Sequence, residues 1–488
     1  MATRTEDDQA GQRTGPGDRL TGTLISAAAV SAVSALLYGY DTGIISAALL
    51  QIRREFSTGS GAEQVVAGSI LLGAVIGALA CSKLSEAMGR RSTVLLVAGV
   101  FVVGALAASV SPSIPLLSAS RVVLGFAVGG ATQTVPMYVA ELAPPARRGR
   151  LVLTFQVGIG VGIVVSTIVG ATESLSWRVS VGLAAAPALL MLLLMLRLPE
   201  SPRWLVGRDR EDDARAVLRR VRAEGADVDG ELADIEAVRH QEEEVAERDR
   251  GWSGLRQAWV RPALVVGCGI AAFTQLSGIE MIIYYAPTIL TDNGFSTHTA
   301  LLVSVGLGIT YLVMMLVGLS VVDRIGRRRL TLVMVPGAAL ALAVLGALFV
   351  TGHDERSDVP FLVTCLIVFM FFNAGGLQLM GWLTGSEIYP LAVRGAGTSA
   401  QAATLWTVNL LITLTLLTII DAIRVGPTMW LYAAFNVAAW VFVFLRMPEL
   451  TGVSLEGIER RLRAGRFRPA EFAAAGDQSG RTSRSGQV

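Results

Sequence analysis

The sequence predicts an all-α membrane protein whose twelve transmembrane helices form two pseudo-symmetric six-helix bundles. Of its 488 residues, 52% are apolar and only 16% are charged, which leaves too little polar surface for a soluble globule of this size. Twelve apolar runs are each long enough to cross roughly 30 Å of hydrocarbon as a helix. Three short charged signatures also occur twice in the same order, which indicates a duplicated ancestral unit.

The apolar runs give the order of the elements. The first six are 22–50, 63–83, 92–111, 115–140, 151–171 and 177–197, and the second six are 260–291, 298–321, 329–350, 360–387, 394–420 and 427–447. They place an N-terminal bundle over 21–197 and a C-terminal bundle over 259–447. Residues 1–20 are Gly-, Thr- and charge-rich, which predicts a disordered N-terminus.

Two charged segments lie outside the bundles. The linker over 198–258 mixes both signs of charge with periodic Ala, Leu and Val, which predicts short amphipathic helices. The tail over 448–488 has one helical stretch, from Leu455 to Leu462, and then loses its periodicity. Lys and Arg concentrate in the short loops after even-numbered spans, so the linker and both termini are expected to be cytoplasmic. We therefore expect a multi-pass protein of the cell membrane.

The duplicated signatures lie at the predicted cytoplasmic ends of spans. The segment 86–91 has a second copy at 323–328. The pair Glu141 and Arg148 corresponds to Glu387 and Arg394, and Pro199-Glu200 corresponds to Pro448-Glu449. Charge pairs between helix ends can lock one mouth of a bundle in one state and release it in another. The alternative, that these charges only set the topology, explains them but not their duplication. The predicted cytoplasmic gate comprises Glu86, Arg90, Arg91, Glu141, Arg148, Asp323, Arg324, Arg327, Arg328, Glu387 and Arg394.

One acidic and one basic residue stand well inside apolar spans of the first bundle. Asp41 lies in the first span and Arg121 about two turns into the fourth. An ionisable group in a span is costly unless it is paired or hydrated, so the two are expected to meet inside the bundle. A buried carboxylate that can exchange an arginine partner for a proton couples protons to a conformational change. The alternative is a permanent structural ion pair.

The seventh span carries a polar group of side chains. Gln275, Glu280 and Tyr284 are spaced to cluster near one face, and Gly278 permits local unwinding between them. This pattern predicts a hydrogen-bonding site for a polar ligand. The alternative is that Glu280 faces a water-filled outer vestibule and contacts nothing.

Four further residues supply amide and indole groups: Gln156 in the fifth span, Trp382 in the tenth, and Trp406 and Asn409 in the eleventh. Alone, each tryptophan is more often a packing or interface residue than a ligand platform. Together, amides can bridge adjacent hydroxyls while an aromatic face stacks on a pyranose or cyclitol ring.

Several strings together resemble one known family. They are Gly39-Tyr40-Asp41-Thr42-Gly43, Pro136-Met137-Tyr138-Val139-Ala140-Glu141, Pro199-Glu200-Ser201-Pro202-Arg203, Tyr284-Tyr285-Ala286-Pro287 and Ser386-Glu387-Ile388-Tyr389-Pro390. From about Ser34 to Leu455 the chain resembles a sugar porter of the major facilitator superfamily. The resemblance implies two rocking bundles around one central site, with sugar contacts at Gln156, Gln275, Glu280 and Trp382. It also implies proton coupling through Asp41 and Arg121, as in the bacterial symporters.

The chain departs from the family pattern at informative positions. Glu280 stands where the family usually has asparagine, and Gln378-Leu379 replaces a Gly-Pro pair before Trp382. Glu86-Ala87 replaces the usual Asp-Arg of the first gate signature. An ionised Glu280 accepts hydrogen bonds but cannot donate them as an amide does. We hypothesise that Glu280 either suits an amine-bearing or polyol ligand or adds a second titrating group beside Asp41.

These patterns predict a monomeric secondary active transporter that moves a sugar, polyol or related hydroxylated solute with a proton. The alternatives are a proton-independent facilitator, a carrier or exporter of a non-sugar solute, and a sugar sensor. No cofactor, metal or nucleic acid is expected. An enzyme is not expected either, because His240, His298 and His353 lie in loops or at a span's edge without a nucleophile beside them. Cys81, Cys268 and Cys365 fit no metal or redox spacing and are interpreted as core residues.

Overall fold

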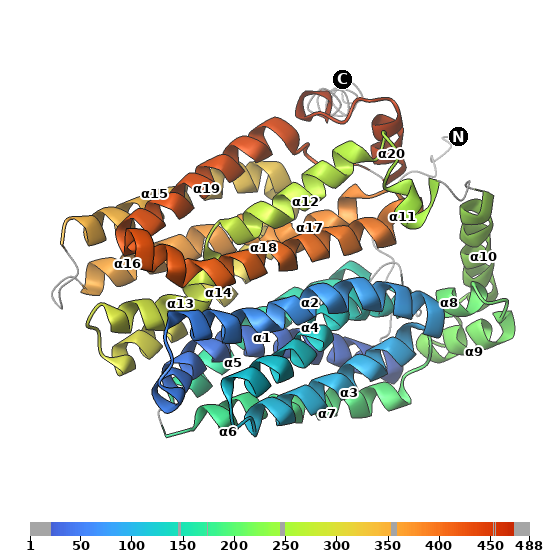
Figure 1. Cartoon of the computed structure of the whole chain (residues 1–488). Helices are drawn as coiled ribbons and strands as arrows, with labels where there is room; N and C mark the ends of the chain where they lie inside the picture. The colour runs from blue at the N-terminus through green and yellow to red at the C-terminus, as the bar shows by residue number, and fades with distance from the viewer. Residues whose placement is uncertain are drawn as a thin grey trace, which may run out of the picture.

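The fold consists of helices whose backbone groups are satisfied internally, as a lipid environment requires. The computed structural model describes residues 21–472 except 145–147, 173, 245–248, 353–358, 452 and 454. Within that part of the chain, 12 helical stretches are long and apolar enough to cross a membrane, which confirms the predicted number. They are arranged as two bundles that lie against each other along their length (Figure 1).

The first bundle is formed by α1 to α7. Its helices are α1 (Gly22–Phe56), α2 (Ser60–Met88), α3 (Arg90–Ser109), α4 (Ile114–Leu142), α5 (Arg148–Ala171), α6 (Trp177–Gly182) and α7 (Ala185–Arg197). The last two share one span, Trp177–Arg197. We call this bundle the N half.

The second bundle, the C half, contains two broken spans. Its elements are α12 (Arg261–Leu276), α13 (Ile279–Asp292), α14 (Thr297–Ile325), α15 (Arg327–Val350), α16 (Val359–Ala374), α17 (Leu377–Ile388), η5 (Leu391–Val393), α18 (Arg394–Ile423) and α19 (Val425–Arg446). The seventh span breaks at Gly278, whose φ of +93° favours glycine. The tenth span breaks at Gly375 and Gly376. Broken helices inside a bundle expose backbone groups and helix termini to whatever binds there.

The linker forms short helices at one end of the molecule. They are α8 (Pro202–Val206), α9 (Glu211–Val221), α10 (Val228–Glu244) and α11 (Gly251–Gly254), and α20 (Leu455–Arg463) lies at the same end (Figure 1). We call this the linker end and the opposite end the far end.

The linker helices divide between the two halves. Trp204 Nε1 in α8 donates to the Glu86 carbonyl at 2.9 Å, and Arg222 Nη1, directly after α9, donates to the Leu142 carbonyl at 2.7 Å. These contacts hold α8 and α9 on the N half. Leu255, directly after α11, packs with Val393 and Ala396 of the C half.

Small residues bring α2 and α4 close together. Gly73 and Gly77 on α2 face the backbone of α4 at Val122 and Phe126, and Gly125 and Gly129 on α4 face the backbone of α2. A side chain at any of the four would collide with that backbone. Small residues at such spacing allow close helix packing without help from the hydrophobic effect, which is weak between helices in lipid.

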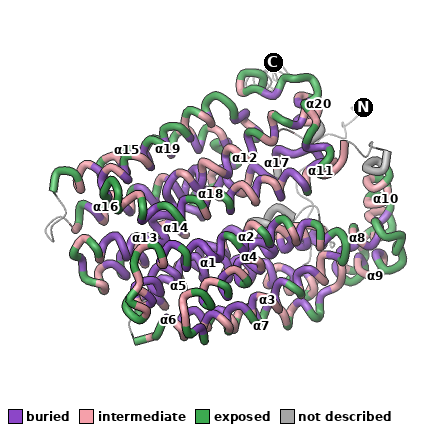
Figure 2. The backbone as a smooth tube through the Cα atoms, viewed as in Figure 1, coloured by how far each residue is buried: buried purple, intermediate pink, exposed green. Residues whose placement is uncertain are grey.

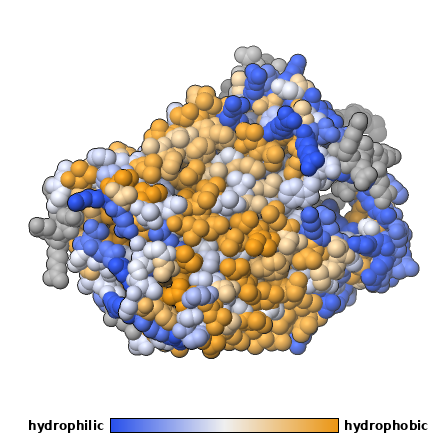
Figure 3. All heavy atoms as spheres, in the orientation of Figure 1, coloured by the Kyte–Doolittle hydropathy of each residue, from blue (hydrophilic) through white to orange (hydrophobic). Residues whose placement is uncertain are grey.

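The surface has the polarity expected in a bilayer. An apolar area covers the sides of the helices, and hydrophilic residues gather at the two ends (Figure 3). Large apolar side chains on this outer surface are exposed, among them Val333 at 70%, Leu340 at 65% and Val103 at 64%. The buried residues lie toward the interior of and between the bundles (Figure 2). Exposed apolar surface of this extent is stable only against lipid.

Candidate functional site

A buried ion pair lies inside the N half. Asp41 of α1 and Arg121 of α4 are 5% and 1% exposed. Arg121 Nη1 lies 3.8 Å from Asp41 Oδ1, and Arg121 Nε donates to the Val66 carbonyl at 2.8 Å. The structure therefore brings the two predicted proton-coupling residues together. Because 3.8 Å exceeds a hydrogen-bond distance, the pair is held by charge rather than by a tight bidentate contact.

Glu280 lies in the first turn of α13, directly after the break at Gly278. It is 2% exposed, and its Oε2 atom has no hydrogen-bond partner in the described part of the chain. Tyrosines of three helices lie within range of its charge: Tyr38 of α1, Tyr284 of α13 and Tyr311 of α14. The arrangement contradicts the idea that Glu280 faces an open vestibule, since its side chain is buried among side chains from both halves.

Aromatic rings extend this cluster toward α17 and α18. Tyr38 and Trp406 pack edge to face with ring centroids 5.2 Å apart, and Trp382 packs on Trp406 at 6.3 Å. Trp406 is fully buried, and its Nε1 has no acceptor among the described residues. An indole that packs on rings while its N–H stays unpaired can bind a polar group of a ligand.

The predicted amides share one property, which is burial without satisfied hydrogen bonds. Gln156 of α5 and Gln275 of α12 have neither side-chain nitrogen nor oxygen paired within the described residues. On α18, Asn409 Oδ1 accepts from Thr413 at 3.3 Å, while Asn409 Nδ2 is unpaired within the same residues. Buried polar atoms are normally paired, so a concentration of such atoms indicates a site for a polar ligand.

The sequence analysis missed three members of the site. Tyr38 and Tyr311 lie within range of the charge of Glu280, and Gln378 is a buried amide whose Oε1 is unpaired in the described chain. Gln378 had been noted only as a departure from the family pattern. The signal for it was available, because an amide in an apolar span is as informative as a charge.

A small cavity lies beside Asp41 between the two halves. Its lining includes Tyr38, Asp41, Thr42, Tyr284 and Trp406. Thr42, the residue after Asp41, and Tyr284 thus face the same cavity from different halves. The site therefore extends across the interface between α1 of the N half and α13 and α18 of the C half.

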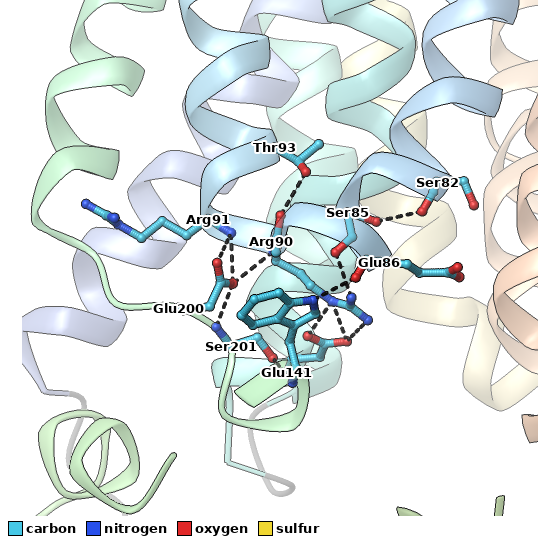
Figure 4. Close-up of polar contacts among 11 residues, drawn as sticks. Ser82, Ser85, Glu86, Arg90, Arg91, Thr93, Glu141, Glu200 and Ser201 are labelled. Carbon is cyan, nitrogen blue, oxygen red and sulfur yellow. Dashed lines mark hydrogen bonds and ion pairs between the residues drawn. The ribbon is translucent and has the colours of Figure 1, made fainter. Parts of the chain in front are cut away.

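The first copy of the predicted gate is a network within the N half (Figure 4). Arg90 Nε lies 3.1 Å from Glu141 Oε2, and the Glu200 carboxylate accepts from the backbone N–H groups of Arg90 and Arg91 at 2.9 Å each. Glu200 thus caps the start of α3. The Glu86 side chain is exposed and points away from this network (Figure 4), and the Arg91 guanidinium donates to the Leu196 carbonyl at 3.0 Å.

The second copy repeats this geometry in the C half. Arg327 Nη2 lies 2.7 Å from Glu387 Oε1, and Glu449 accepts from the backbone N–H groups of Arg327 and Arg328 at 2.9 and 3.2 Å. Gly89 and Gly326 precede the two caps with φ of +98° and +96°. Asp323 adds a bond to Arg327 at 2.7 Å that Glu86 does not make to Arg90.

The remaining gate residues are less engaged. Arg324 is exposed, the Arg328 guanidinium donates to the Phe444 carbonyl at 2.9 Å, and Arg394 Nε donates to the Tyr389 carbonyl at 3.3 Å. The side chain of Arg148 lies outside the described residues, as does His353. Sequence reasoning missed the capping role of Glu200 and Glu449, although both stood in a duplicated Pro-Glu pair.

At the far end, polar contacts join the two halves directly. Arg53 Nη1 lies 2.8 Å from Asp292 Oδ1, and its Nε lies 3.3 Å from Glu63 of its own half. Three further hydrogen bonds cross between the halves there: Arg54 to Thr297 at 2.8 Å, Ser60 to Asp421 at 2.9 Å and Gln64 to Thr418 at 3.0 Å. We call this set the far-end latch. At the linker end, Ser399 donates to Ser82 across the halves at 2.9 Å.

Comparison with known proteins agrees with this architecture. The family model described as "Sugar (and other) transporter" matches residues 27–462. The chain is 36% identical to the D-xylose transporter of Levilactobacillus brevis over 438 residues, covering 89% of this chain and 94% of that protein. It is 34% identical to the galactose-proton symporter of Escherichia coli over 442 residues, covering 90% of this chain and 94% of that protein.

A solved structure shows the same fold. The proton:xylose symporter XylE of E. coli, bound to 6-bromo-6-deoxy-D-glucose, matches with a TM-score of 0.73 and 25% identity, covering 90% of this chain and 98% of that one. The expected major facilitator architecture is thereby confirmed. With its family model, its relatives and its twelve spans in agreement, the chain belongs to the sugar transporter family, whose members are multi-pass membrane transporters and not enzymes.

Proposed function

We propose that this protein is a proton-coupled symporter of a sugar, a polyol or a related small hydroxylated solute. The observation that carries the proposal is the buried Asp41–Arg121 pair, which adjoins a set of buried, unpaired polar groups contributed by both halves. A solute bound there contacts both halves at once, so its binding favours the arrangement in which they come together around it.

The chemistry of the site fits a hydroxylated ring. Gln156, Gln275, Gln378 and Asn409 offer amide donors and acceptors, and each amide can bridge neighbouring hydroxyls. Trp382 and Trp406 offer apolar ring faces for the axial C–H groups of a sugar or cyclitol. The xylose and galactose specificities of the relatives support the same class of solute.

The proton has a receptor in Asp41. The carboxylate is 5% exposed, and its charge is compensated by a guanidinium at 3.8 Å. A rearrangement that separates the pair leaves a buried charge, which protonation of Asp41 removes at lower cost. In one state Asp41 is ionised and paired with Arg121, and in the other it is protonated and separated from Arg121. A solute that stabilises one of these states more than the other couples its own transport to the proton.

The duplicated networks at the linker end hold the helices of each half together. Each arginine pairs with a glutamate of the same half, as in Arg90–Glu141 and Arg327–Glu387. Each half therefore moves as one body, and opening or closing takes place at contacts between the halves, such as the far-end latch and Ser82–Ser399. In this proposal the linker end is cytoplasmic, and the two halves span residues near 21–197 and 259–447. The transporter acts as a monomer in the cell membrane.

The test is uptake into proteoliposomes of labelled D-xylose, D-galactose, D-glucose, myo-inositol and D-glucosamine, each with and without an inward proton gradient. Accumulation of a solute only with the gradient is the expected result. Equilibration that ignores the gradient contradicts proton coupling and makes the protein a facilitator. If protein that folds and reconstitutes normally takes up none of these solutes, the proposed class of solute is wrong.

A further inference from the structure

We propose that Glu280 is a second proton-binding carboxylate of the transport site, which holds a proton while Asp41 is paired with Arg121. The inference rests on the proposed function, because it assigns a second protonation site to a symporter. It concerns a residue at which this chain departs from the family pattern.

The charges buried in the middle of the molecule do not balance. Asp41 and Glu280 are both 5% exposed or less, and Arg121 is 1% exposed. Arg121 lies against Asp41, whereas Glu280 forms no ion pair with a lysine or arginine of the described residues and its Oε2 is unpaired among them. Because one guanidinium compensates only one carboxylate in an apolar interior, the second carboxylate is stable there as the neutral acid.

The titratable groups within range of the Glu280 charge are neutral. They are the hydroxyls of Tyr38 from α1, Tyr284 from α13 and Tyr311 from α14. Gln378 adds a buried, neutral amide near Tyr311. A tyrosine hydroxyl can donate to a carboxylate and accept from a carboxylic acid, so these neighbours accommodate Glu280 in both protonation states.

The position of Glu280 in α13 keeps its ionised form accessible. It is the second residue after the αL glycine that breaks the span, so it lies among the free N–H groups of the first helical turn. Burial favours the neutral acid and the helix terminus favours the anion. Because burial and the helix terminus favour opposite forms, Glu280 changes its protonation when its burial changes. Such a change occurs when the halves separate and water reaches the side chain.

Tyr284 connects the two carboxylates. It follows Glu280 by one helical turn in α13. Tyr38, Asp41, Thr42 and Tyr284 also line one cavity. When Asp41 loses Arg121 and takes up a proton, the freed guanidinium can compensate an ionised Glu280. Glu280 thus holds a proton in the arrangement in which Asp41 is paired with Arg121 and holds none.

Infrared difference spectroscopy of the purified full-length protein, titrated without any solute, tests the proposal directly. The carboxylic-acid C=O stretch of a buried protonated carboxyl shifts in D₂O. We expect such a band in the wild type, its loss in Glu280→Gln and its retention in Asp41→Asn. The control is Glu63→Gln, which removes a carboxylate that is 1% exposed but lies beside Arg53 and should keep the band. A band that survives in Glu280→Gln overturns the proposal.

Exchange of D-xylose and D-galactose across proteoliposomes at equal pH on both sides gives a second measurement. Asp41→Asn should still show a pH-dependent exchange rate with a slope of up to about tenfold per pH unit, and Asp41→Asn/Glu280→Gln should be flat. A flat profile in Asp41→Asn alone contradicts the assignment. If Glu280 is instead ionised in the wild type and selects D-glucosamine over D-glucose, a selection lost in Glu280→Gln, the residue binds an amine and the proposal is wrong.

The two proposals fail in different ways. If the wild type shows no gradient-driven uptake but does show the infrared band, symport is refuted and the protonation of Glu280 is not. Loss of the band with gradient-driven uptake intact refutes only the role of Glu280. Tyr284→Phe should also change the pH at which the band titrates, whereas Tyr285→Phe, which removes a hydroxyl that donates to the Thr413 carbonyl at 3.0 Å, should not.

Discussion

Buried amides in this protein are of two kinds. Gln401 Nε2 donates to the Gly381 carbonyl at 2.8 Å, and Asn436 Nδ2 donates to the Ser277 carbonyl at 2.8 Å. These amides hold the two broken spans of the C half in place. Gln275 and Gln156, by contrast, have no partner within the described chain. The first kind contributes to stability, and the second kind is available to a ligand.

Replacing glutamine by leucine should have different effects at a structural amide and at an amide available to a ligand. Gln275→Leu removes unpaired polar atoms, so the free energy of unfolding should stay within about 1 kcal/mol of wild type, while the Michaelis constant for uptake rises by about tenfold or more. Gln401→Leu leaves the Gly381 carbonyl without its donor and should lower the free energy of unfolding by about 1–3 kcal/mol. Thermal unfolding in detergent and uptake kinetics give the two quantities. Equal destabilisation by both variants contradicts this division.

Arg121 should be more costly to remove alone than together with its partner. Arg121→Leu leaves Asp41 as a buried charge without compensation and should lower stability by about 3 kcal/mol. Adding Asp41→Asn removes that charge, so the double variant should recover much of the loss. Thermal unfolding of the wild type, both single variants and the double variant forms a complete cycle. A double variant that is as unstable as Arg121→Leu argues that the arginine acts through its bond to Val66 instead.

Most residues of the site could be found in the sequence because polar groups in apolar spans are rare. Asp41, Arg121, Gln156, Gln275 and Glu280 were all recognised in this way. Tyr38 and Tyr311 could not be, because an aromatic ring in a span is ordinary and only the fold shows where its hydroxyl lies.

At the scale of elements, the far-end latch is the main polar connection between the halves in the described structure. Its centre is Arg53, which lies between Glu63 of the N half and Asp292 of the C half. Glu63 is 1% exposed, and the Asp292 side chain is half exposed. The contact to the buried Glu63 carboxylate lies within the N half and resists solvent screening, so it holds Arg53 in position for its exposed pair with Asp292 across the halves.

Arg53→Ala should shift the protein toward opening at the far end. Loss of an interaction worth about 1 kcal/mol changes the ratio of two conformations roughly fivefold. Spin labels at Ser174→Cys in the N half and His298→Cys in the C half, in a background without Cys81, Cys268 and Cys365, report the distance between the halves. Both positions are exposed. We expect a larger population of long distances in Arg53→Ala.

Arg178→Ala is the matched control. Arg178 also pairs at the far end, with Glu55 at 2.7 Å, but both residues belong to the N half. Its removal should leave the distance distribution unchanged. A distribution that changes equally in both variants means that loss of charge, rather than loss of the latch, opens the far end.

The helices themselves were predicted well and their ends less well. The first span was expected over 22–50, whereas α1 continues to Phe56. Its last turns contain Arg53, Arg54 and Glu55, whose charges end an apolar run but are paired with residues of other helices. The sequence does not show such partners, so a hydropathy pattern ends the helix too early. The break at Gly278 was foreseen from the glycine, while the break at Gly375 was not.

At the scale of the whole molecule, charge is distributed unevenly between the two ends. Arg90, Arg91, Arg327, Arg328 and Arg394 all belong to the linker end, together with the charged helices α9 and α10. The far end has fewer basic residues, among them Arg53, Arg54 and Arg178. This asymmetry is the basis for placing the linker end in the cytoplasm.

Orientation can be measured with single cysteines in the cysteine-free background. Ser174→Cys at the far end should react with a membrane-impermeant maleimide in intact cells. Ser253→Cys in α11 at the linker end should react only after the membrane is permeabilised. Both side chains are exposed in the structure, so access depends on the side of the membrane alone. The opposite pattern would invert the topology and with it the direction of the proton gradient that the site uses.

The division of the linker has a mechanical consequence. The segment up to α10 is fixed to the N half through Arg222 and through the bond of Arg239 to Asp209 at 2.8 Å, whereas α11 is fixed to the C half. Only residues 245–248 connect the two docked parts, and a chain from Glu244 to Asp249 reaches at most about 18 Å. The linker is therefore a tether of set length. It limits how far the halves can part on its side of the membrane, and so bounds the amplitude of each transport stroke.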